Sequence, residues 1–155
     1  MLLMQSRPPY SCYIAASCLL VCAASLAFAS RGLFTGYSYW LDEIFSVSAS
    51  VDTWQQLYER WILRDVHPPL YQVALKIWMS FFGSTEVATR VLSFSFSAVT
   101  LGAFSFDAIV TRRWRRVLAL LFVGASPFFA YYSQETRSYS LVLALSSIVA
   151  LAALE

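Results

Sequence analysis

Long apolar segments without charge are the feature that most constrains this chain. The first runs from about Ser11 to Ser30 and contains no Asp, Glu, Lys or Arg. A bilayer-spanning helix needs about 20 mostly apolar residues, because the hydrocarbon core is about 30 Å thick and a helix rises about 1.5 Å per residue. We therefore expect this segment to cross a membrane.

Three further segments have the composition of membrane spans, over about 87–110, 117–132 and 138–155. The last two are short, and the first contains the acid Asp107 near its end. The whole chain is 59% hydrophobic and only 13% charged, whereas soluble domains carry about 25% charged residues. The sequence thus predicts an all-α, polytopic transmembrane helical bundle.

A fifth apolar stretch, 70–82, has about 13 residues and is short for a span. Two prolines precede it and a glycine follows it, which suits the start and the end of a helix. Its polar residues recur every four positions and so share one stripe of a helix. We expect it to lie along the membrane surface as an interfacial helix. The polar residues are Gln72, Lys76 and Ser80.

The arginines that follow the second span form the densest basic cluster, and the positive-inside rule makes their loop cytoplasmic. If 70–82 does not cross, 31–86 is one long outer loop and the connection at 134–139 lies on the same side. We expect a multi-pass protein of the cell inner (plasma) membrane with its site on the outer face; an endoplasmic reticulum membrane stays open. The arginines are Arg112, Arg113, Arg115 and Arg116.

Two alternatives concern the ends of the chain. Ala27-Phe28-Ala29 is similar to a signal-peptide cleavage site, although the apolar run is long for a signal peptide and Arg7 is its only preceding basic residue. The sequence stops at Glu155, at the end of an apolar run, so we expect a fragment of a longer protein.

Composition also excludes some functions. The net charge of +2 and the lack of a basic stripe argue against nucleic-acid binding. All three cysteines lie in the first apolar segment, away from His and acidic residues, so we expect neither a disulfide framework nor a thiolate metal site there.

Two adjacent acids, Asp42 and Glu43, lie shortly after the first apolar segment. Acids near a bilayer usually face a cavity or a partner, and a carboxylate can act as a general base. Alternatively, they are loop carboxylates in water, with Asp42 capping a short helix. Spacing alone leaves both interpretations open.

The only histidine, His67, lies in the segment Asp65-Val66-His67-Pro68-Pro69-Leu70-Tyr71. The two prolines restrict the backbone and hold His67 at the entry to the interfacial helix. A role in chemistry and a plain helix start are both compatible with this pattern.

The connector between the third and fourth apolar segments reads Tyr131-Tyr132-Ser133-Gln134-Glu135-Thr136-Arg137-Ser138-Tyr139. Arg137 can bind two oxygens of a phosphate, and Glu135 can orient that arginine or face a bound metal. The alternative is a polar connector whose tyrosines anchor at the membrane interface.

Four short motifs in this order resemble the N-terminal part of the GT-C glycosyltransferases. The most similar group is that of protein O-mannosyltransferases and bacterial aminoarabinose-type transferases, the dolichyl-phosphate-mannose mannosyltransferase-like proteins. The motifs are Leu41-Asp42-Glu43, His67-Pro68-Pro69-Leu70-Tyr71, Ala88-Thr89-Arg90-Val91-Leu92-Ser93 and Tyr132 to Tyr139.

This resemblance implies a GT-C transmembrane bundle with interfacial helices in the first outer loop. It also implies inverting sugar transfer from a polyprenyl-phosphate donor at the outer face, with Asp42 and Glu43 as catalytic acids. His67, Glu135, Arg137 and Tyr139 would lie at the donor phosphate. Sugar, acceptor and metal stay open.

The chain departs from the family at His67, where the aminoarabinose-transferring members have a lysine preceded by a metal-binding acid. Here Val66 precedes it, so a divalent metal is not implied by that route. The competing hypothesis is a truncated, non-catalytic membrane protein or lipid-binding subunit. A transporter fragment is disfavoured because the spans are uninterrupted.

Overall fold

The computed structural model describes residues 10–63 and 69–154, and in this part of the chain all regular structure is helical. The predicted all-α class is therefore confirmed. Two helices are long and apolar enough to cross a membrane: Tyr10–Gly32, which joins α1 (Tyr10–Ala29) to a short helical turn, and α5 (Glu86–Thr111). His67 lies outside the described residues.

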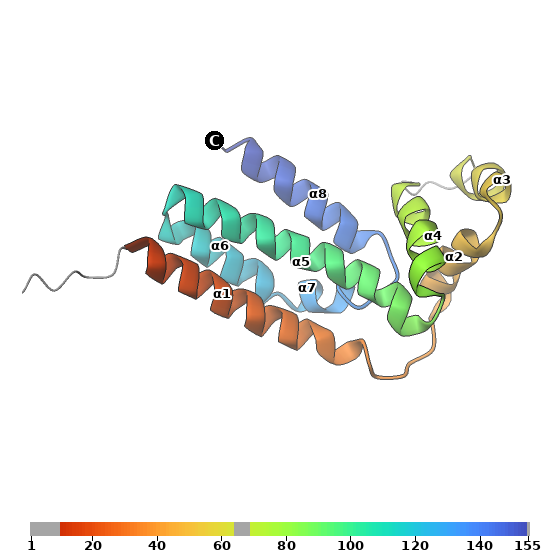
Figure 1. Cartoon of the computed structure of the whole chain (residues 1–155), viewed down its shortest axis with the longest axis horizontal. Coiled ribbons are helices and arrows are strands. Elements are labelled where there is room, and N and C mark those ends of the chain that lie inside the picture. Colours follow the sequence, from red (N-terminus) through yellow and green to blue (C-terminus); the bar gives the residue numbers. More distant parts are fainter. Residues whose placement is uncertain (1–9, 64–68, 155) are drawn as a thin grey trace, which may run out of the picture.

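Four helices lie side by side in a bundle, with α5 at its centre (Figure 1). Helix α5 packs against α1, α6 (Trp114–Gly124) and α8 (Tyr139–Ala152). Buried Ile14 and Cys18 of α1 meet Leu101 of α5 and Leu120 of α6. Apolar packing of this kind makes α5 the element on which the other helices are positioned.

The segment expected to form one span over 117–132 is two helices, α6 and α7 (Pro127–Tyr132). The break has a local cause: Ser126 is extended because Pro127 disfavours a helical conformation in the residue before it. At 11 residues for α6 and 14 for α8, neither helix alone has the roughly 20 residues of a full span.

A second group of helices lies across one end of the bundle, which we call the site end (Figure 1). It comprises α2 (Leu41–Val51), α3 (Trp54–Gln56), a π-helical turn at Leu57–Ile62 and α4 (Leu70–Phe82). The bounds of α4 confirm the helix predicted at 70–82. It ends at Gly83, whose φ of 82° lies in the left-handed region that glycine adopts readily.

The polar stripe of α4 does not face water along its whole length. Gln72 is buried, and the Lys76 ammonium donates hydrogen bonds to the backbone carbonyls of Ser50 and Asp52 at the end of α2. Ser80, the third residue of the stripe, is exposed. The other exposed positions of α4 are apolar: Leu70, Ile77, Phe81 and Phe82. The stripe thus attaches α4 to α2 and leaves an apolar face outward.

The opposite end of the bundle, which we call the basic end, carries the turn between α5 and α6 (Figure 1). Its arginines are Arg112, Arg113, Arg115 and Arg116. Helix α5 thus separates the basic cluster from the acidic motif of α2 by its own length.

Candidate functional site

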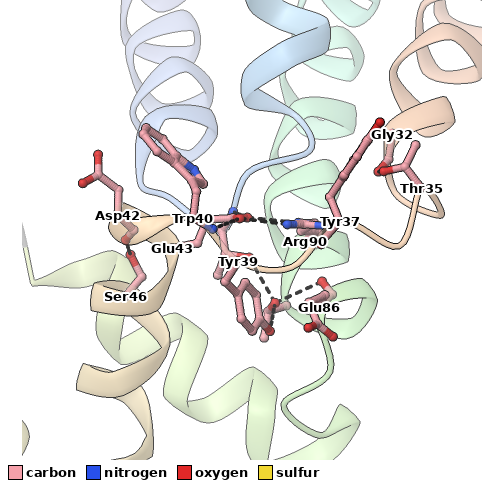
Figure 2. Close-up of polar contacts among 12 residues, drawn as sticks. Gly32, Thr35, Tyr37, Tyr39, Trp40, Asp42, Glu43, Ser46, Glu86 and Arg90 are labelled. Atoms are coloured by element: carbon pink, nitrogen blue, oxygen red, sulfur yellow. Dashed lines mark hydrogen bonds and ion pairs between the residues drawn. The ribbon is translucent and has the colours of Figure 1, made fainter.

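A buried ion pair lies at the centre of the site end. Glu43, in the first turn of α2, is 1% exposed, and Arg90, in α5, is 6% exposed. Arg90 donates to the carboxylate through Nε at 3.0 Å and Nη2 at 2.8 Å, the bidentate geometry that guanidinium and carboxylate favour (Figure 2). Segments 47 residues apart in sequence are held together by this pair.

Further hydrogen bonds extend the pair to two loops. The backbone N–H of Thr136 donates to Glu43 Oε1 at 2.9 Å, and Arg90 Nη1 donates to the backbone carbonyl of Tyr37 at 3.0 Å. Burial by itself raises the pKa of Glu43, but the hydrogen bonds from Arg90 and Thr136 outweigh it and hold the pKa below its ordinary value. Glu43 is therefore an ionised, fully engaged carboxylate that favours a positioning role.

Asp42, the neighbouring acid, points away from this pair (Figure 2). Its side chain is 44% exposed, so its carboxylate is accessible to a reactant. Arg137 approaches it from the α7–α8 connector: Nη2 lies 3.7 Å from Asp42 Oδ2, and Nη1 donates to the Asp42 backbone carbonyl at 3.2 Å. The structure thus brings together two residues that sequence analysis had placed at the site.

The Arg137 guanidinium retains capacity for a ligand. Its Nε is buried and has no hydrogen-bond partner among the described residues. The Tyr139 ring lies 5.8 Å from the guanidinium carbon, in reach of a cation–π contact. The Arg137 side chain is 13% exposed, and the part that reaches the surface can bind an oxyanion.

Glu135 does not orient Arg137 through an ion pair among the described residues; only its backbone carbonyl accepts from the Arg137 N–H, at 2.8 Å. Its side chain is 6% exposed and lines a cavity of about 360 Å³ that Glu43 and Arg90 also line. Burial, only partly offset by the Tyr131 hydroxyl, raises the pKa of Glu135. The expected contact of Glu135 with the donor phosphate stays a prediction.

Hydroxyl contacts hold the connector against α4 and α5. The hydroxyl groups of Tyr39 and Thr136 lie 2.8 and 3.0 Å from the Thr89 hydroxyl. The Ser93 hydroxyl lies 2.8 Å from that of buried Tyr71 and donates to the Arg137 carbonyl at 3.4 Å. These contacts fix the backbone on which Arg137 is carried.

Sequence analysis quoted Arg90 only within a motif and gave it no role. A signal for it was present, because an arginine within a long apolar helix is costly unless it meets a partner. Which acid it meets depends on the tertiary fold.

A metal centre is not formed by the described residues: within 10–63 and 69–154, no group of three or more His, Cys, Asp or Glu side chains could hold a metal ion. The cysteines of this part of the chain are all free. His67 lies outside these ranges, so its predicted place at the phosphate stays a prediction.

An apolar groove of about 440 Å³ lies between α6–α7 and α8. Tyr139, the residue beside the Arg137 guanidinium, is one of its lining residues. Most of the others are apolar or aromatic: Phe122, Val123, Phe128, Phe129, Tyr132, Val142 and Leu143. The groove therefore joins the polar site end to the apolar side of the bundle.

Comparison with family models, curated proteins and solved structures found no significant match to the chain.

Proposed function

We propose that this chain belongs to an integral membrane glycosyltransferase of the GT-C type, which moves a sugar from a polyprenyl-phosphate donor to an acceptor with inversion. The observation that carries the proposal is the accessible Asp42 carboxylate beside the Arg137 guanidinium, 3.7 Å apart. Both belong to motifs that resemble that family.

A membrane location is supported by the apolar side chains that the bundle exposes along its sides. They include Leu19, Leu20, Phe106, Leu118, Phe122 and Val149. In water such a surface is unfavourable, whereas in lipid it costs nothing. With the arginines of the basic end in the cytoplasm, the site end lies at the outer face.

The reaction we propose uses Asp42 as general base. The acceptor hydroxyl loses its proton to the Asp42 carboxylate while its oxygen forms a bond to the anomeric carbon. The bond between that carbon and the phosphate oxygen breaks, and the lipid phosphate leaves with the electron pair. Attack from the face opposite the leaving group inverts the anomeric centre.

The developing phosphate charge is stabilised by Arg137, whose guanidinium is held before the donor arrives. Preorganised cations of this kind act without reorganisation during the reaction. The apolar groove beside Tyr139 has the chemistry to hold the first isoprene units of the donor. Glu43 and Arg90 contribute by positioning the first turn of α2, on which Asp42 lies.

A lipid-binding protein without catalysis is the second candidate, because the groove and Arg137 would serve it equally well. The two candidates differ in what Asp42 does. Loss of its negative charge would leave lipid binding intact but would end sugar transfer.

The test uses the complete gene product in proteoliposomes with labelled polyprenyl-phosphate sugars. We expect Asp42→Asn to lower kcat by at least about 100-fold, the low end of general-base effects, and to keep donor binding. Glu59→Gln is the matched control, because Glu59 is an exposed acid of the same group of helices at the site end. Transfer by Asp42→Asn at the rate of the control would refute the assignment of the base.

A further inference from the structure

The basic end of the bundle contains a hollow of about 760 Å³. It lies where the start of α1, the start of α6 and the end of α8 meet. Three arginines, two aromatic residues and two small or aliphatic residues line it: Tyr10, Arg113, Trp114, Arg115, Arg116, Ala119 and Leu154. Ligand sites in proteins commonly have volumes of about 300–1,000 Å³, so a molecular headgroup fits here.

Positive charge is in excess around this hollow. Arg116 is compensated, because its Nε lies 3.2 Å from Oδ2 of the buried Asp107. Arg113 and Arg115 are exposed and pair with no carboxylate among the described residues. Helix α6 begins at Trp114 without an acidic residue in its first turn, so its dipole adds to the positive potential. The arginines are repelled by the positive end of the helix dipole and by one another. An anion in the hollow would reduce both repulsions.

The walls have the character of a membrane interface. Tyr10 and Trp114 meet edge to face, with ring centroids 6.2 Å apart, and such amphipathic rings prefer the headgroup level of a bilayer. Leu154 and Ala119 supply apolar surface beside the arginines. A ligand that suits all three components has an anionic phosphate attached to apolar chains.

We propose that this hollow binds the headgroup of an anionic phospholipid of the inner leaflet, with Arg113 and Arg115 on its phosphate. Basic pockets between transmembrane helices on the cytoplasmic side are known to hold such headgroups. The proposal rests on a membrane location and is independent of sugar transfer. A cluster that serves only to orient the chain would need neither a hollow nor aromatic walls.

The neighbouring arginine offers a matched control. Arg112 belongs to the same turn but does not line the hollow, so its removal lowers the charge of the basic end equally without touching the site. Its φ of 52° lies in the left-handed region, which glycine adopts without strain. Arg112→Gly therefore removes one charge without straining the folded backbone.

The experiment is titration of the purified full chain in neutral detergent with dioleoyl-phosphatidylglycerol, followed by native mass spectrometry. Dioleoyl-phosphatidylcholine and inorganic phosphate are the comparison ligands. We expect one phosphatidylglycerol to bind at least about tenfold more tightly than phosphatidylcholine. Arg113→Gln, which removes one charge as Arg112→Gly does, should weaken that preference, and Arg113→Gln combined with Arg115→Gln should abolish it. Arg112→Gly should keep the preference. Far-ultraviolet circular dichroism checks that each variant stays helical.

Three outcomes would overturn the proposal. Equal binding of both lipids would show that charge does not select the ligand. An equal loss in Arg112→Gly and Arg113→Gln would show diffuse attraction to the loop. Inorganic phosphate that competes as well as its lipid counterpart would make the site one for a free anion.

Discussion

The centre of the site end is a buried ion pair, whereas at the basic end most of the charges are exposed. Arg90 donates two hydrogen bonds to Glu43, and the pair also engages the backbone of Thr136 and Tyr37. At the basic end, within the described residues, one acid, Asp107, meets one arginine of the cluster. Buried pairs fix geometry because breaking them is costly, and exposed charges stay available to a ligand. Arginine thus holds the backbone in position at the site end and is free to attract an anion at the basic end.

The comparison is tested most strongly by removing one member of the buried pair. Arg90→Gln leaves the Glu43 carboxylate buried with its main partner gone, and we expect a loss of about 3–5 kcal/mol in the free energy of unfolding. Arg115→Gln at the basic end should change it by less than about 0.5 kcal/mol. Urea titration in detergent micelles measures both. Equal losses in the two variants would mean that the pair does not hold the site end together.

The cation beside Asp42 should affect donor binding more than stability. Arg137→Ala removes the charge-assisted hydrogen bonds that we propose for the donor phosphate. A hydrogen bond to a charged group is worth about 1.5–3 kcal/mol. We expect KM for the lipid donor to rise about 10- to 100-fold. Arg137→Lys keeps the charge and loses the bidentate geometry, so it should fall in between. Steady-state kinetics at varied donor concentration measures this, and an unchanged KM in Arg137→Ala would contradict the phosphate role.

The pKa values of two carboxyls at the site end are shifted in opposite directions. The pKa of Glu43 is lowered, so its contribution to stability is present above its unfolded-state pKa and is lost as the pH falls through the folded-state pKa. The pKa of Glu135 is raised, chiefly by burial. Its folded state therefore binds the extra proton between the two pKa values, and stability falls as the pH rises through that window.

Glu135→Gln removes this penalty by replacing the acid with a neutral side chain of the same shape. We expect it to stabilise the protein by about 0.5–2 kcal/mol at pH 8, the range of common stabilising substitutions, and to have almost no effect at pH 4. Thermal unfolding in detergent at both pH values measures the difference. An equal gain at pH 4 and pH 8 would show that packing, and not ionisation, is the cause.

Local patterns predicted much of this fold. The glycine after 70–82 and the prolines before it predicted α4 with its observed bounds, and motif order placed Asp42 and Arg137 together. Local patterns could not show which surface a polar stripe meets: Lys76 binds the end of α2 and not water. Nor could they show the pairing of Glu43 with Arg90, because a contact between residues so far apart in sequence arises only from tertiary packing. Pro127 is a local signal for a helix break, but the continuous apolar composition of 117–132 favoured a single span.

The smallest expected effect concerns the turn at the basic end. Arg112 has a φ of 52°, and a non-glycine residue in this conformation costs about 1–2 kcal/mol. Glycine removes that cost but gains freedom in the unfolded chain worth about 0.4–1 kcal/mol, so Arg112→Gly should stabilise the protein by only about 0.5 kcal/mol. Ala at the same position keeps the strain and removes the charge, which makes Arg112→Ala the control. If the free energy of unfolding rises equally in both variants in urea titration, relief of repulsion among the arginines is the cause. In that case, crowding of positive charge destabilises the basic end.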